Sequence, residues 1–72
     1  MLQRLRDFRE DRDISQQKMA ELLNVAQTTY SDYELGRLNI PISVLKELAL
    51  FFNTSVDYIL GLTNVREPYP RG

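Results

Sequence analysis

The chain has 72 residues, which is enough for one small domain. It contains no cysteine and no histidine, so disulfides are excluded and the commonest general base and metal ligand is missing. Nine Lys and Arg residues face ten Asp and Glu residues, and the net charge of −1 lacks the basic excess usual in nucleic-acid-binding domains.

The amino-terminal segment predicts an amphipathic helix over residues 2–12. Its apolar residues recur every third position, at Leu2, Leu5 and Phe8, with charged residues between them. This spacing predicts a narrow buried stripe. Three other arginines of this segment are Arg4, Arg6 and Arg12. They fit a solvated helix face on which they pair with acids three or four positions away, although a role in a binding surface stays open.

Two further helices follow in quick succession. Ser15 is a predicted N-cap for a helix over residues 16–23, and Asn24 can adopt the left-handed conformation that ends a helix. The next helix begins near Ala26 or Gln27 and stops at Gly36. The spacing of Ala26, Tyr30 and Tyr33 predicts that they share its buried face, while the opposite face is polar; it carries Gln27, Thr28, Ser31 and Asp32.

The carboxyl-terminal half predicts two more helices. One spans residues 42–52 after Pro41, with its apolar face formed by Leu45, Leu48, Ala49 and Phe52. Ser55 caps a last short helix over residues 56–60, which Gly61 closes. No strand pattern is present, so we expect an all-α fold of five short helices in a domain over residues 1–61. Residues 62–72 lack periodicity and form a tail, either disordered or associated with a dimer.

The second and third helices form a helix-turn-helix, because the turn between them is too short for an antiparallel hairpin. The third helix then projects its amino-terminal, polar face outward. A helix amino terminus attracts phosphate, a glutamine can pair with adenine, and a threonine methyl can contact thymine. This pattern predicts contact with duplex DNA.

The residues resemble a known family. The stretches "LRDFRED", "SQQKMAELLNVAQTTYSDYELG" and "IPISVLKELALFFNTSVDYILG", with their spacing, are similar to the Cro/repressor-type (Xre-like) helix-turn-helix domains of bacteria and phages over residues 2–61. The resemblance implies a lambda-repressor-like fold. It also implies sequence-specific binding of double-stranded DNA in transcriptional control, and we expect a repressor.

The resemblance also assigns site residues. Gln27, Thr28 and Asp32 correspond to base-contacting positions. The positions that contact the DNA backbone are Gln16, Thr29, Ser31, Arg37 and Asn39. Arg9 and Glu34 match a structural ion pair beneath the recognition helix. Two residues depart from the family pattern: Asp32 is acidic at a base-facing position, and Leu35 replaces a common polar residue.

The carboxyl-terminal half carries more apolar side chains than a small domain readily buries, among them Leu38 and Leu50. Scattered exposure is the simpler interpretation. The alternative, which we favour, is a homodimer that binds a palindromic operator, with candidate interface residues Phe51, Tyr58 and Leu62.

Two rival functions remain. One is a protein-interaction module on the same fold, such as an antitoxin-like or anti-repressor partner, with weak or no DNA binding; the near-neutral charge and Asp32 motivate it. The other is an enzyme, which the missing histidine and cysteine argue against. We expect no cofactor, metal or small-molecule ligand. No apolar run approaches the ~20 residues that a bilayer needs, and no signal-peptide pattern is seen, so we expect a cytoplasmic protein without membrane contact.

Overall fold

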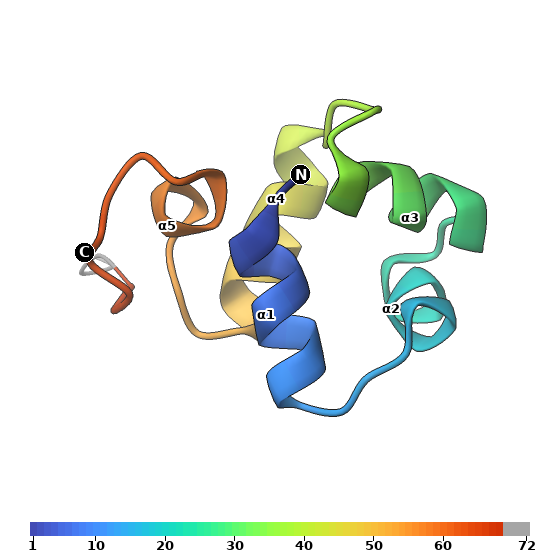
Figure 1. Cartoon of the computed structure of the whole chain (residues 1–72), viewed down its shortest axis with the longest axis horizontal. Coiled ribbons are helices and arrows are strands. Elements are labelled where there is room, and N and C mark those ends of the chain that lie inside the picture. The colour runs from blue at the N-terminus through green and yellow to red at the C-terminus, as the bar shows by residue number, and fades with distance from the viewer. Residues whose placement is uncertain (69–72) are drawn as a thin grey trace.

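The computed structural model describes residues 1–68. Within that range the backbone forms five α-helices and no strand (Figure 1): α1 (Gln3–Asp11), α2 (Gln16–Leu23), α3 (Gln27–Leu35), α4 (Ile42–Phe51) and α5 (Val56–Leu60). The all-α class and the five helices predicted from the sequence are confirmed. Residues 69–72 of the predicted tail lie outside the described residues.

Side-chain caps and left-handed residues set half of the helix ends. The Ser15 hydroxyl accepts a hydrogen bond from the Lys18 N–H at 3.0 Å, and the Ser55 hydroxyl accepts one from the Tyr58 N–H at 3.0 Å. Three helices end on a residue with positive φ: Asn24 at 58°, Gly36 at 76° and Gly61 at 80°. These signals are local, which is why the sequence predicts them.

Helix α1 is shorter than predicted by one residue at each end. Leu2 is not helical, because its N–H donates to the Glu34 carbonyl at 2.7 Å and holds the start of the chain against the end of α3. Arg12 is the C-cap of α1. Helix α4 likewise ends at Phe51, and Phe52 is its C-cap.

Every helix contributes to one core. The phenyl rings of Phe8 and Phe52 stack with centroids 5.1 Å apart, which joins α1 to the end of α4. The other buried apolar side chains around them come from all five helices: Leu5, Met19, Ala20, Tyr30, Tyr33, Leu48, Ala49 and Ile59. Burial of these side chains is the main stabilising term for such a small domain.

The prediction that Ala26 belongs to the buried face of the third helix is wrong. Tyr30 and Tyr33 are buried, but Ala26 is exposed. Ala26 is the N-cap of α3, with extended φ and ψ of −68° and 151°. The i, i+4, i+7 rule applies only to residues inside the helix, and a cap lies outside it.

The core separates the molecule into two sides. Figure 1 shows α2 and α3 on one side, α5 and the following segment on the other, and α1 and α4 between them. The segment after α5 lies against α1, where Arg4 donates to the carbonyl of Thr63, and against the α4–α5 turn, where the Thr54 hydroxyl donates to the carbonyl of Arg66 at 2.6 Å. Figure 1 shows α3 at the end of the molecule opposite the described segment that follows α5, residues 62–68.

Candidate nucleic-acid interface

The turn between α2 and α3 is short and tightly bonded. Asn24 adopts the left-handed conformation, and its N–H donates to the last carbonyls of α2. The Val25 N–H donates to the Ala20 carbonyl at 2.9 Å, and α3 begins two residues later at Gln27. Figure 1 shows α2 nearly end-on while α3 lies across the view, so the two helices cross steeply. This crossing presents the start of α3 at the surface.

The polar face of α3 points away from the core. Gln27 and Thr28 are exposed, and the predicted contact residues behind them are half-buried; these are Thr29, Ser31 and Asp32. We call Gln27, Thr28 and Asp32 the recognition face. Within residues 1–68 their side chains form no hydrogen bond or ion pair, so the recognition face is available to a ligand.

The first turn of α3 has no side-chain cap, unlike those of α2 and α5. The N–H groups of a first helical turn have no intrahelical acceptor. They lie next to the exposed Gln27 and Thr28. An uncapped helix amino terminus of this kind suits an anionic group such as a DNA phosphate.

An ion pair lies beneath α3. Arg9 of α1 donates through Nε to Glu34 Oε2 at 2.6 Å and through Nη2 to Glu34 Oε1 at 3.3 Å. The Glu34 side chain is 2% exposed and that of Arg9 is 12% exposed. Arg9 Nη1 also donates to the Ile14 carbonyl at 2.9 Å. The two-point geometry fixes the orientation of α3 on α1.

Gln16, a predicted phosphate contact at the start of α2, belongs to the same cluster. Its Nε2 atom donates to Glu34 Oε1 at 3.2 Å, and its side chain is half-buried. A side-chain amide has two N–H donors, so one remains after this bond. Gln16 therefore links the buried pair to the surface between α2 and α3.

The cluster changes the ionisation of its members. Burial opposes the ionisation of Glu34, but the hydrogen bond from Arg9, the neighbouring Tyr30 hydroxyl and the hydrogen bond from Gln16 together outweigh it and lower the pKa of Glu34. The hydrogen bond to Glu34 raises the pKa of Arg9. Burial, and then the nearby Glu34 carboxylate, raises the pKa of Tyr30, whose hydroxyl lies buried without a well-placed hydrogen-bond partner. The Arg9–Glu34 pair is thus charged at neutral pH.

The loop from α3 to α4 carries the two remaining predicted backbone contacts. Arg37 and Asn39 are both exposed. The Arg37 N–H donates to the Asp32 carbonyl at 2.9 Å, which fixes the start of the loop against the second half of α3. In the described part of the chain neither side chain forms a hydrogen bond or ion pair, so both are free to meet a ligand that contacts α3.

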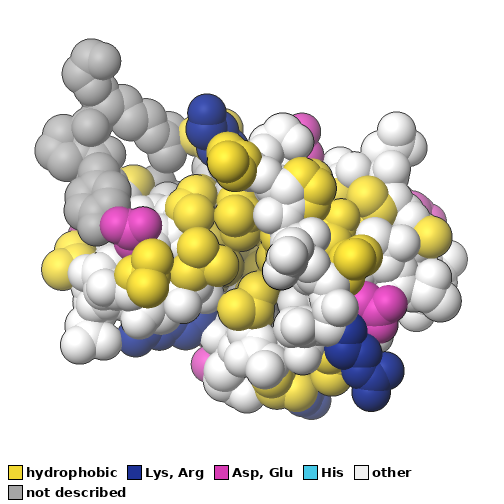
Figure 2. All heavy atoms as spheres, turned by 90° about the horizontal axis from the view of Figure 1, so that it is seen from above, with side chains coloured by type: hydrophobic (Ala, Val, Ile, Leu, Met, Phe, Trp, Pro, Cys, Tyr) yellow, Lys and Arg dark blue, Asp and Glu magenta, His cyan; other side chains and the backbone are white. Residues whose placement is uncertain are grey.

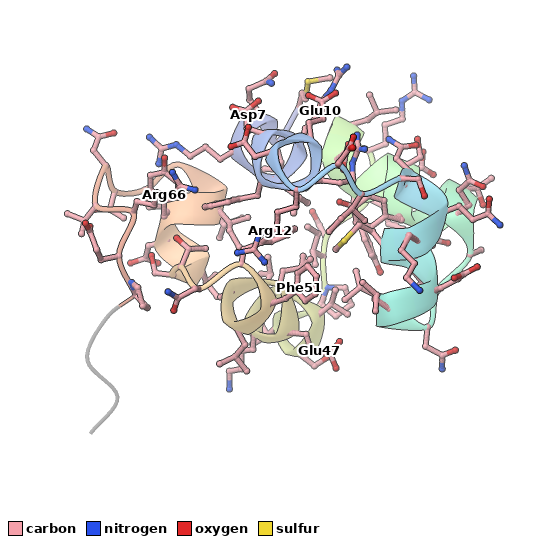
Figure 3. The ribbon with its side chains drawn as sticks, turned by 90° about the horizontal axis from the view of Figure 1, so that it is seen from below. Asp7, Glu10, Arg12, Glu47, Phe51 and Arg66 are labelled. Carbon is pink, nitrogen blue, oxygen red and sulfur yellow. The ribbon has the colours of Figure 1, made fainter. Side chains whose placement is uncertain are left out.

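The prediction of a solvated arginine face on α1 is correct for Arg6, wrong for Arg4 and incomplete for Arg12, which is exposed but also bonded to α4. Arg6 forms an exposed pair with Glu10 at 3.4 Å. Arg4 stacks on the Tyr58 ring, 4.1 Å from its centroid, and donates to the Tyr58 carbonyl at 3.0 Å. Arg12 reaches from the end of α1 to α4 (Figure 3) and donates to the Phe51 carbonyl at 2.8 Å. These two side chains hold the fold together.

Few cations are therefore left near α3. Arg66 is also engaged, because its guanidinium lies 4.9 Å from the Phe8 centroid. Lys18 of α2 pairs with Glu21 at 3.9 Å. Within residues 1–68, Arg37 and Lys46 are the side-chain cations for which no ion pair, hydrogen bond or ring contact is found. Arg37, in the loop directly after α3, is one of these two.

The three predicted dimer residues lie in different surroundings. Phe51 is 41% exposed and lines a groove between α2 and α4 with Met19 and Leu22. Tyr58 is half-buried between Phe8 and the Arg4 guanidinium. Leu62 is 73% exposed. Tyr58 is thus already packed within the chain, whereas Leu62 and part of Phe51 remain open.

An apolar cleft that the sequence analysis missed lies beside the α3–α4 loop. Figure 2, which views the molecule of Figure 1 from above, shows hydrophobic side chains gathered around a hollow. The cleft is lined by Leu2, Tyr33, Leu38, Ile40, Leu45 and Leu60. Ile42, close to it in sequence, is 73% exposed. Because these residues come from the amino terminus, the α3–α4 loop and three helices, no periodicity signals their convergence.

Comparison with known proteins identifies the architecture. Residues 5–59 match the model of a helix-turn-helix family. The chain is a member of this family. The predicted resemblance to Cro/repressor-type (Xre-like) domains and the lambda-repressor-like fold are therefore confirmed. The family is non-enzymatic, in agreement with the sequence-based prediction.

The helix-turn-helix relatives include regulators of bacteria and phages. The chain is 38% identical over 66 residues to the uncharacterized HTH-type transcriptional regulator YobD of Bacillus subtilis, covering 92% of this chain and 59% of that protein. It is 34% identical over 70 residues to the regulator AnsR of the same organism, covering 97% and 60%. It is 30% identical over 66 residues to the cryptic phage CTXphi transcriptional repressor RstR of Vibrio cholerae, covering 89% and 60%.

The chain thus spans about three-fifths of the length of the curated relatives it matches. No solved structure matches it significantly. No helix in the described part of this helix-turn-helix protein has the length and apolar character needed to cross a membrane.

Proposed function

We propose that this chain binds double-stranded DNA in a sequence-specific manner and acts in the cytoplasm as a transcriptional regulator, specifically a repressor. The observation that carries the proposal is the exposed recognition face of α3, which has an uncapped amino terminus beside it. Regulators among the relatives, one of them a phage repressor, support it.

The residues divide by role in this proposal. Gln27, Thr28 and Asp32 contact base edges in the major groove, where each good pairing contributes about 1–3 kcal/mol of discrimination. The DNA backbone is contacted by Gln16, Thr29, Ser31, Arg37 and Asn39. Gln16 is supported by its spare N–H, and Arg37 by its unpaired guanidinium.

We further propose that two copies bind a palindromic operator. Recognition helices of such a dimer lie about 34 Å apart, one turn of the duplex. The exposed apolar side chains of the cleft beside the α3–α4 loop, together with Leu62, support a dimer interface that includes this cleft.

Paired variants test the interface. Sedimentation equilibrium of Leu62→Lys is expected to give a monomer where the native chain gives a dimer, while Phe51→Lys retains the dimer. The reverse result would move the interface to the groove between α2 and α4. A native chain that remains monomeric both free and on DNA would contradict the dimer.

The second candidate is a protein-interaction module with little or no DNA binding. The engagement of Arg4, Arg12 and Arg66 within the fold favours it, because few cations remain to neutralise phosphates. Affinity for mixed-sequence duplex, measured against salt concentration, separates the two functions. A DNA-binding regulator is expected to bind at low salt, with a slope of log K against log salt of about −0.9 per phosphate contacted.

Matched charge variants sharpen this titration. Arg37→Ala is expected to reduce the slope by about one, whereas Arg6→Ala, which removes an exposed charge from α1, leaves it nearly unchanged. Absence of binding to any duplex at low salt would favour the protein-interaction module.

A further inference from the structure

Asp32 is unusual among the acids of α3. The helix contains two acids, and Glu34 is buried and neutralised by Arg9 at 2.6 Å. Asp32 is partly exposed, and its carboxylate forms no hydrogen bond or ion pair within residues 1–68. Only its main-chain carbonyl is engaged, by the N–H of Arg37 at 2.9 Å. The Asp32 carboxylate therefore makes no hydrogen bond or ion pair that stabilises the described part of the fold.

The position of this carboxylate on the helix is informative. Thr28 and Asp32 lie four residues apart on α3, so they share one face. Four residues span about 6 Å along a helix, which is close to the rise of two base pairs. A helix that places Gln27 and Thr28 against base edges thus brings Asp32 within two base pairs of them.

A carboxylate restricts which base it can face. It only accepts hydrogen bonds, and the donors in the major groove are the N4 amino group of cytosine and the N6 amino group of adenine. Guanine and thymine present acceptors there. Adenine places its N7 acceptor beside N6, whereas cytosine has no second acceptor beside N4 on its own edge. A lone carboxylate therefore favours cytosine over the other three bases.

We propose that Asp32 is a specificity-determining residue that selects a cytosine in each half-site, within two base pairs of the bases contacted by Gln27 and Thr28. This inference rests on the proposed DNA-binding function and extends it to a named base. The negative charge disfavours every site that offers Asp32 no amino group, because the nearby cations are few. Asp32 thus raises specificity by weakening binding to all other sequences.

The test is selection of bound sequences from a random duplex pool, with the native chain and three variants in parallel. The native chain is expected to enrich cytosine at one position by about 5- to 150-fold over the other bases. Asp32→Asn is expected to switch that position to adenine, because an amide pairs with both N6 and N7. Asp32→Ala is expected to lose the preference at that position alone and to bind mixed sequences more tightly.

Glu47→Gln is the matched control, since it also removes one exposed negative charge but lies on α4 (Figure 3). It is expected to retain the native cytosine preference. Enrichment of one sequence by all four proteins, with no change at any base, would overturn the role of Asp32 and leave the proposed function intact. No enrichment by the native chain would remove the proposed function, and this inference with it.

Discussion

Replacing Glu34 by alanine tests the reasoning about the buried ion pair. The substitution removes both acceptors of Arg9, and it leaves the Arg9 side chain, 12% exposed, with the Ile14 carbonyl as its remaining bonded partner. Breaking one side of a buried pair costs about 3–5 kcal/mol, because the other charge stays buried. Gln16 also loses its bond to Glu34 Oε1.

The expected effect is large relative to the stability of so small a domain. A chain of this length has a free energy of unfolding of about 4–11 kcal/mol. Since 1 kcal/mol shifts the melting temperature of such a domain by about 4–8 °C, Glu34→Ala is expected to lower it by about 12–40 °C. Thermal unfolding followed by circular dichroism measures this shift.

Two controls make the result specific. Glu10→Ala removes a glutamate from an exposed pair, 3.4 Å from Arg6, and is expected to cost less than about 1 kcal/mol. The double variant Arg9→Met with Glu34→Leu is expected to recover much of the lost stability, because it leaves no unpaired charge. A melting temperature of Glu34→Ala equal to that of Glu10→Ala would refute the argument.

Three further predictions concern ionisation, DNA readout and the carboxyl-terminal segment. Because the pKa of Glu34 is lowered in the folded chain, its stabilising contribution is complete above the unfolded pKa of about 4.3 and is lost as the pH falls through the folded value. Native and Glu34→Gln chains should therefore differ most in unfolding free energy near neutral pH and converge in acid; a constant difference would contradict this. Thr28→Ala should relax the base preference at one position and leave the salt dependence of DNA binding unchanged. Gln16→Ala should lower the affinity for all DNA sequences alike. Quantitative DNA-binding assays would detect both effects, and the opposite pattern would show that the roles of the two residues are reversed. Arg4→Ala should speed amide hydrogen exchange in residues 62–66 before it affects α3, since Arg4 bonds Thr63 and Asn64; equal exchange in both chains would exclude this anchoring role.

The helices follow from signals that lie within a few residues of one another. Ser15 and Ser55 bond N–H groups three positions on, and Asn24 and Gly36 end their helices through their own φ angles. Such interactions are formed by the local chain, so the sequence alone predicts the five helices and the helix-turn-helix. The outward position of Gln27 and Thr28 follows from the same periodicity.

The tertiary structure alone decided the partners of the arginines. Arg4 meets residues 54 to 60 positions away, and Arg12 meets one 39 positions away. Their near neighbours in sequence are acids, which made a solvated face the natural interpretation. The cleft lined by Leu2, Leu38 and Leu60 likewise exists only because the amino terminus, the α3–α4 loop and α5 converge. These contacts depend on how the helices pack, and no pattern within a single helix encodes which distant carbonyl or ring an arginine will meet.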